Sequence, residues 1–216
     1  YSYKDISIFK EMISEKFSKK HFIIFGANTL DPISGKFFNS MLAVDNNFKI
    51  IQSYNKRKLV PFGEFLPFES FLNNFGLKKI TEGHGSFLKG EKNKNLLIEN
   101  LNILPLICYE VIFTDLIQKS TKDTNMIINI SEDGWFGESI GPDQHFSKSV
   151  FRAIENDTFF LRSTNQGVSA IIDNKGNIIK QLDRNEAGNI EFEVPLIKSN
   201  KIKNDLIFFI LLITYL

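Results

Sequence analysis

The chain has 216 residues, of which 43% are hydrophobic and 24% charged, with a formal net charge of +1. This length and composition suit a folded domain with a sizeable core and exclude a mainly disordered chain. The near-neutral charge gives no support for nucleic-acid binding, and the single cysteine, Cys108, excludes a disulfide within the chain. The sequence contains neither a glycine-rich phosphate loop nor a Cys/His cluster at metal-ligand spacing, so we predict no metal and no cofactor.

The first half of the chain predicts a helix and then several strands. Residues 4–18 carry apolar side chains on one helical face, namely Ile6, Phe9, Met12, Ile13 and Phe17. A short apolar run at 21–28 predicts a buried strand. Two further runs flank Asn46 and Asn47 and predict a hairpin, at 37–45 and 48–56. The prolines and glycine of KLVPFGEFLPF indicate a shaped loop at 58–68, before a short amphipathic helix at 68–77.

The second half alternates strands and helices. Buried strands are predicted at 101–110 and 125–131, and Pro105 inside the first indicates an edge or a bulge. Helices are predicted at 113–123 and 143–157, the latter with Asp143 as its N-cap, after a loop at 133–142. The remaining strands lie at 159–167, 168–182 and 188–195, with a turn at 174–176. We therefore expect a layered α/β sandwich whose sheets are not purely parallel.

The chain ends in an apolar run, DLIFFILLITYL, that is uncharged from Leu206 onward. The run is too short to cross a bilayer, which takes about 20 residues. A buried C-terminal helix is one interpretation. We favour the start of a membrane helix that continues beyond Leu216, with the basic stretch KSNKIKND as a membrane-proximal segment.

Cys108 ends the apolar run LPLICYE, and the chain then turns into a predicted helix. A lone cysteine is most often a small core residue. A strand-to-helix elbow, however, exposes a side chain at the edge of the sheet and directs backbone N–H groups at whatever the thiolate attacks. Lys56 and Glu64, from a strand end and the following loop, would complete a Cys–Lys–Glu site. Each alone is typical of a solvated surface residue. The histidines, at 21, 84 and 145, lack the sequence context of a catalytic base, although the sequence leaves open whether one of them lies near Cys108 in the fold.

Four stretches, in this order, resemble the apolipoprotein N-acyltransferase branch of the nitrilase superfamily. They are YNKRKLVPFGEFLP, ICYE, DGWFGESIGPDQH and RSTNQGVSAIID, within a similarity that runs from Phe22 to Pro195. The resemblance implies a nitrilase-like αββα sandwich. It also implies a reaction in which a membrane phospholipid acylates the cysteine, and the N-terminal amine of a diacylglyceryl-cysteine lipoprotein then takes the acyl chain from the thioester. The enzyme would lie in the bacterial inner membrane, with this domain on the periplasmic side.

The resemblance also implies roles for individual residues. Cys108 is the expected nucleophile, and Lys56 the lysine that stabilises the oxyanion together with the backbone N–H after Cys108. Glu64 and Glu110 match further acidic positions around the site. Tyr109, Trp135 and Phe136 match aromatic positions near the acyl or lipid-entry region; for Trp135 and Phe136, ordinary packing under a loop is the alternative.

The chain departs from the family pattern at two places. The family's catalytic glutamate lies in a Trp-Pro-Glu-like context before the first helix, and no such motif is present here. We therefore expect a fragment without its general base, comprising an incomplete domain at 1–198 and a membrane-proximal segment with a partial transmembrane helix at 199–216. The second departure is Glu132-Asp133, where the family usually has Asn-Asp.

Two other functions are compatible with the same motifs. A soluble nitrilase-type amidase would use Cys108, Lys56 and a glutamate with water as the acceptor, but the apolar tail and LVPFGEFLP argue against it. A non-catalytic relative acting as a binding module is the third alternative, supported only by the missing base.

Overall fold

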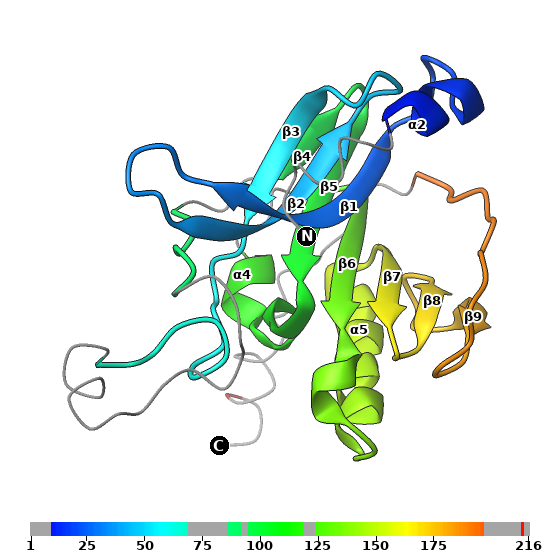
Figure 1. Cartoon of the computed structure of the whole chain (residues 1–216). Coiled ribbons are helices and arrows are strands. Elements are labelled where there is room, and N and C mark those ends of the chain that lie inside the picture. Colours follow the sequence, from blue (N-terminus) through cyan, green and yellow to red (C-terminus); the bar gives the residue numbers. More distant parts are fainter. Residues whose placement is uncertain (1–9, 69–85, 92–94, 119–123, 197–212, 214–216) are drawn as a thin grey trace.

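The computed structural model describes residues 10–68, 86–91, 95–118, 124–196 and 213. These residues form two β-sheets, several short helices and one longer helix (Figure 1). The first sheet is antiparallel and contains β1 (Ile23–Leu30), β2 (Phe37–Val44) and β3 (Ile50–Asn55) in that order. The predicted hairpin around Asn46 and Asn47 is therefore confirmed as β2 and β3. The predicted buried strand at 21–28 is β1, an edge strand in which only Ala27 is fully buried.

The second sheet has six strands in chain order. These are β4 (Leu96–Ile98), β5 (Leu101–Ile107), β6 (Met126–Glu132), β7 (Phe159–Asn165), β8 (Ser169–Ile172) and β9 (Ile178–Leu182). The sheet is mixed, because β5, β6 and β7 are parallel and the outer strands are antiparallel. The carboxyl ends of β5, β6 and β7 consequently meet at one edge. The three-residue strand β4 was not predicted.

Helices follow or connect the parallel strands. The 3₁₀ turns η2 (Cys108–Ile112) and η3 (Asp133–Phe136) directly follow β5 and β6, and α4 (Thr114–Gln118) follows η2. The long helix α5 (Gly141–Asn156) leads back to β7 and packs on the second sheet (Figure 1). Most of the loop predicted at 133–142 is thus η3 and the start of α5.

Two apolar cores lie on opposite faces of the second sheet. One core joins Met41, Ala43 and Tyr54 of the first sheet to residues such as Ile103 and Met126. The other lies between the second sheet and the helices, and includes Leu104, Leu106, Ile127, Phe160 and Ala153. Neighbouring residues along β5, β6 and β7 alternate between the two cores, so both faces are buried. This double burial explains why these strands are continuously apolar in the sequence. The predicted α/β sandwich is confirmed.

Three local predictions are refined or wrong. Pro105 is not on an outermost strand, but β4 covers only Leu101–Ile103, so Pro105 lies where β5 has a partner on one side alone. Asp143 is not the N-cap of α5: the cap is Ile140, and Asp143 lies in the first turn, after Pro142. The segment 188–195 is not a strand, although Ile190 and Val194 pack against the inter-sheet core.

The structure describes only part of the helices predicted toward the two ends of the chain. Of the helix predicted at 4–18, α2 (Lys10–Lys16) is described, and none of its side chains is buried. The helix predicted at 68–77 lies outside the described residues apart from Phe68, as does the C-terminal apolar run apart from Ile213. No helix within the described ranges is long and apolar enough to cross a membrane.

Close backbone contacts fix the point where β3 ends. The amide of Lys56 donates to the Asn39 carbonyl in β2, and the Lys56 carbonyl accepts from the amide of Gly90. A Cβ atom on Gly90 would lie 2.1 Å from the Asn55 carbonyl oxygen, a distance that no real side chain tolerates. Gly90 is therefore required for this close approach.

We expect Gly90→Ala to lower the free energy of unfolding by about 1–3 kcal/mol, because the backbone beside Lys56 must move to admit the methyl group. Lys89→Ala, at the exposed neighbouring position, is the matched control and should change stability little. Urea unfolding of both variants measures the difference. Equal stability of the two variants would contradict the close contact.

Candidate active site

A cavity of about 850 Å³ lies between the two sheets, beside the carboxyl ends of β5 and β6. Its walls are largely apolar and come from β1, β6, β7 and β8. Polar side chains gather in it, including Cys108, Lys56, Glu64 and Glu132. The three residues predicted to form a Cys–Lys–Glu site therefore face one shared space. Cavities of this size and mixed lining are typical of sites for small ligands.

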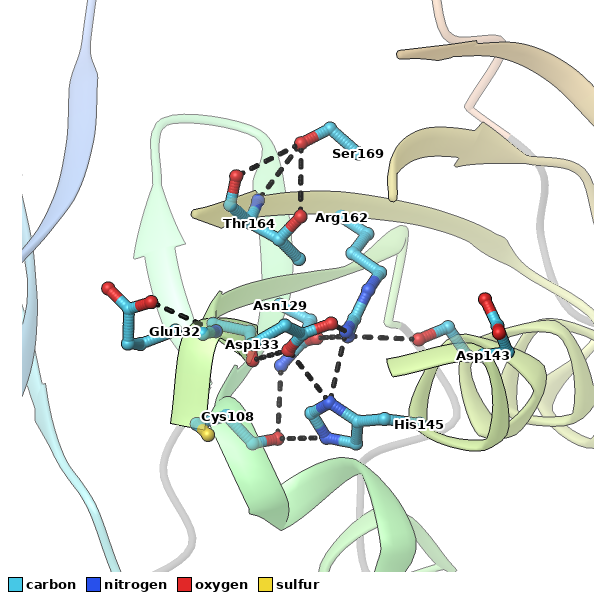
Figure 2. Close-up of polar contacts among 12 residues, drawn as sticks. Cys108, Asn129, Glu132, Asp133, Asp143, His145, Arg162, Thr164 and Ser169 are labelled. Atoms are coloured by element: carbon cyan, nitrogen blue, oxygen red, sulfur yellow. Dashed lines mark hydrogen bonds and ion pairs between the residues drawn. The ribbon is translucent and has the colours of Figure 1, made fainter. Parts of the chain in front are cut away.

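Cys108 is the first residue of η2, directly after β5, and its backbone is strained. Its φ is 50°, in the left-handed region that residues other than glycine rarely adopt. The thiol and the carbonyl of Cys108 point in different directions: the sulfur lies away from His145, whereas the carbonyl oxygen points at it (Figure 2). The predicted strand-to-helix elbow is thus present, and its side chain is partly exposed to the cavity. Strain of this kind at a cavity is a feature of functional sites.

Lys56 and Glu64 form a buried ion pair. The Lys56 Nζ atom lies 2.8 Å from Glu64 Oε2, and the Lys56 side chain is 1% exposed. The same carboxylate oxygen accepts from the amide of Val60, and Oε1 accepts from the Asn39 side chain. Glu64 is therefore held in place by donors from β2 and from its own loop. Its geometry suits holding the lysine ammonium in place.

Glu110 joins the elbow to the segment that carries Lys56. Its Oε1 accepts from the Tyr54 hydroxyl and from the amides of Arg57 and Lys58, and its Oε2 accepts from the amide of Ile107. Burial raises the pKa of Glu110, and these hydrogen bonds act in the opposite direction. Burial, and then the neighbouring carboxylate, raise the pKa of Tyr54, which keeps its proton as a donor. One buried carboxylate thus connects both sheets beside the cavity.

A second polar network lies behind the elbow (Figure 2). Arg162 on β7 donates to Asp133 at 2.7 Å, and also to Asn129 on β6 and Ser149 on α5. His145 on α5 places Nδ1 3.0 Å from Asp133 and Nε2 3.2 Å from the Cys108 carbonyl oxygen. A carbonyl only accepts, so His145 Nε2 carries a hydrogen. The network therefore anchors the strained residue through its backbone.

The charges of this network depend on each other. Burial alone would raise the pKa of Asp133, but the hydrogen bond from His145 and the charge of Arg162 outweigh it and hold that pKa at about 2. Burial lowers the pKa of Arg162. Asp133 and, to a smaller extent, Cys108 act in the opposite direction and raise that pKa. Both charges are paired at 2.7 Å with almost no exposure to solvent.

The aromatic residues predicted near the site have different surroundings. Trp135 lines the cavity, is 54% exposed and lies against Gly63 of the loop that follows Lys56. Phe136 packs on the His145 ring instead, and Tyr109 packs on Phe113. Neither these two nor Glu110 is among the described residues that line the cavity. Packing beneath the loop therefore accounts for Phe136.

Several residues of the site were not identified from the sequence: Asn39, Asn129, Asp133, His145 and Arg162. Two of them could have been identified from the sequence. Asn129 and Arg162 interrupt otherwise apolar buried strands, and a buried polar or charged group requires a partner. The sequence around His145 gave no such indication, because it is that of an ordinary amphipathic helix. The described residues contain no group of three or more His, Cys, Asp or Glu side chains arranged to hold a metal ion.

We expect Lys56→Met to destabilise the fold by about 3–5 kcal/mol, because it leaves the buried Glu64 carboxylate unpaired. The double variant Lys56→Met/Glu64→Gln removes both charges and should recover most of that loss. Chemical unfolding of the two variants and the wild type tests the coupling. Equal destabilisation by the single and double changes would contradict a buried ion pair.

Asp133 should make stability depend on pH. Its folded-state pKa is about 2, below the ordinary value of 3.8, so its contribution is complete above pH 3.8 and is lost as pH falls toward 2. Asp133→Asn should therefore cost about 2 kcal/mol at pH 6, and this cost should shrink progressively below pH 4. Urea titrations of both proteins between pH 6 and 2.5 measure the difference, and a cost that does not change with pH would contradict it.

Curated relatives share much of the sequence. The chain is 41% identical over 160 residues to an apolipoprotein N-acyltransferase of Rhizobium leguminosarum bv. trifolii, covering 74% of this chain and 30% of the relative. It is 40% identical over 159 residues to the protein of the same name from Rickettsia typhi, covering 73% and 32% of the two chains. The chain thus spans about a third of the length of these relatives.

Solved structures share the fold at low sequence identity. A carbon-nitrogen hydrolase from Helicobacter pylori superposes with a TM-score of 0.64 at 13% identity, covering 85% of this chain and 64% of that one. Saccharomyces cerevisiae Nit3, a member of the nitrilase superfamily, gives 0.59 at 18% identity, covering 87% and 69%. The carbon-nitrogen hydrolase family model matches residues 15–203, which include every residue of the site described above. The chain therefore belongs to the carbon-nitrogen hydrolase family.

Proposed function

We propose that the protein containing this chain is an apolipoprotein N-acyltransferase, which acylates the N-terminal amine of a lipoprotein. The observation that carries the proposal is the meeting of Cys108 and the Lys56–Glu64 pair on one cavity, in a chain about 40% identical to relatives of that name. Because the chain covers only part of those relatives, the activity is proposed for the whole protein.

The proposed reaction has two displacements. The Cys108 thiol loses its proton and its sulfur attacks the ester carbonyl of a membrane phospholipid; a C–S bond forms, the C–O bond breaks, and the proton passes to the leaving oxygen to release the lysophospholipid as an alcohol. The amine of a diacylglyceryl-cysteine then attacks the thioester, forms the amide and returns the thiol. Each displacement passes through a tetrahedral oxyanion, which requires fixed donors.

Lys56 is the proposed oxyanion donor, together with the backbone N–H after Cys108. Its ammonium is held by Glu64, and its backbone is held by Asn39 and Gly90. Glu110 connects the next two amides to the elbow that carries Cys108. One such donor contributes about 2.7–4 kcal/mol to transition-state stabilisation. Because this ammonium is half of a buried ion pair, loss of Lys56 should reduce both turnover and stability.

The proposed partners are a phospholipid and a diacylglyceryl-modified apolipoprotein, at the periplasmic face of the bacterial inner membrane. The apolar walls of the cavity suit a fatty chain. Exposed apolar side chains on the two adjacent loops, Phe62, Phe68, Trp135 and Ile140, suit contact with lipid. The membrane-proximal segment at 199–216 remains part of this proposal.

The experiment supplies the protein, expressed from its whole gene in membranes, with phospholipid labelled in its acyl chain. We expect the label to remain on the protein in a bond that hydroxylamine cleaves, and to be absent from Cys108→Ala, which has no nucleophile. Gel autoradiography with and without hydroxylamine measures the bond.

A label that persists in Cys108→Ala would remove the cysteine from the mechanism. Release of ammonia from simple amides without any lipid-derived label would favour the amidase instead. Ser86→Ala, outside the cavity, is the control for expression and should carry the wild-type amount of label.

A further inference from the structure

Glu132 is a carboxylate that the reaction described above leaves unused. It ends β6, and the alternation of side chains along that strand places Ile128, Ile130 and Glu132 on the same face. All three line the cavity. Ile130 pairs in register with Ile107, the residue before Cys108. Glu132 therefore lies one step beyond the nucleophile on the adjacent strand, and Figure 2 shows its side chain leaving β6 away from the His145 network.

Among the charged side chains that line the cavity in the described part of the chain, Glu132 differs in having no counter-charge. Lys56 is neutralised by Glu64 at 2.8 Å, and Arg162 by Asp133 at 2.7 Å. Glu132 accepts only from neutral donors, the amide of Gly134 at 3.0 Å and the Asn165 side chain at 2.6 Å. These pairs leave one negative charge on the cavity wall. Such a charge attracts a cation.

Both oxygens of Glu132 keep capacity for a further donor. A carboxylate has about four acceptor positions, and only one contact to each oxygen is present among the described residues. The two neutral donors hold the carboxylate in one orientation without cancelling its charge. A primary ammonium, with three N–H donors, is the complementary ligand.

We propose that Glu132 binds the protonated N-terminal amine of the acyl acceptor and presents it to the thioester on Cys108. This inference rests on the proposed function and extends it to the second half-reaction. An α-amino group has a pKa of about 8, so it is mostly an ammonium at neutral pH. That ammonium loses one proton, through the partly exposed carboxylate to water, before its nitrogen attacks. The C–N bond then forms, the C–S bond breaks, and a second proton passes from nitrogen to the leaving sulfur.

A purely structural role for Glu132 predicts different behaviour. The side chain caps η3 by accepting from the Gly134 amide. Glu132→Gln keeps an oxygen that can accept this hydrogen bond but removes the negative charge, so it separates capping from cation binding. Glu138→Gln removes the same charge from an exposed position in the same loop, outside the cavity, and is the matched control.

The experiment first isolates the acyl-enzyme of each protein with labelled phospholipid in membranes, then adds a nucleophile and follows loss of label. One nucleophile is a synthetic diacylglyceryl-cysteine peptide with a free amine, and the other is hydroxylamine, which is uncharged at neutral pH. We expect Glu132→Gln to slow transfer to the peptide by about tenfold to a hundredfold, the value of one charged hydrogen bond. Its reaction with hydroxylamine should match that of the wild type, and Glu138→Gln should match the wild type with both.

The outcomes distinguish a failure of the proposed function from a failure of the proposed role of Glu132. Absence of a thioester on the wild-type protein would overturn the proposed function. Thioester formation with unchanged transfer to the peptide in Glu132→Gln would overturn only the role of Glu132. An equal loss of rate toward both nucleophiles would mean that Glu132 supports the structure of the site and does not bind the amine.

Discussion

The buried carboxylate of Glu110 is the contact on which the geometry of the site depends. It accepts hydrogen bonds from β3, from the two residues after Lys56 and from the end of β5. These segments belong to different sheets, and among the described strands no pairing between the two sheets fixes their separation. A buried acceptor with four donors has one favourable position, because any displacement leaves polar groups unsatisfied in the interior. The lysine and the cysteine are therefore held at one relative position.

Most ionic groups of the site are paired with a partner of opposite charge, and several of these pairs hold another part of the site in place. Glu64 holds Lys56, and Asp133 with Arg162 and His145 holds the backbone of Cys108. These groups are nearly inaccessible to water, so each charge requires its partner. The strained φ of Cys108 persists because contacts from β5, β6 and α5 determine it together. In the proposed reaction, the groups that act on the substrates are the Cys108 thiol, the Lys56 ammonium and the Glu132 carboxylate.

Much of the fold followed from local patterns. The strands β5, β6 and β7 are recognisable because each is buried on both faces and is therefore continuously apolar, and the β2–β3 hairpin because turn residues separate two apolar runs. The segment 188–195 alternates apolar and polar residues but pairs with no strand of the described sheets; its carbonyl at Glu191 accepts from the Lys180 side chain on β9. Strand formation requires a partner, which composition does not encode. The N-cap of α5 is Ile140 and not the predicted Asp143, because the helix already begins before Pro142, which lies in its first turn.

The sequence by itself indicated the elbow at Cys108, because a cysteine at the end of an apolar run before a helix is a local pattern, and the family motif made this cysteine the proposed nucleophile. It also indicated Lys56, Glu64 and Glu110 through motifs typical of the family. Only the tertiary structure decided that Glu110 connects the sheets, that His145 reaches the Cys108 carbonyl and that Phe136 packs away from the cavity. These contacts join residues up to 56 positions apart. Their existence depends on how two sheets and a helix pack, and no local periodicity records that packing.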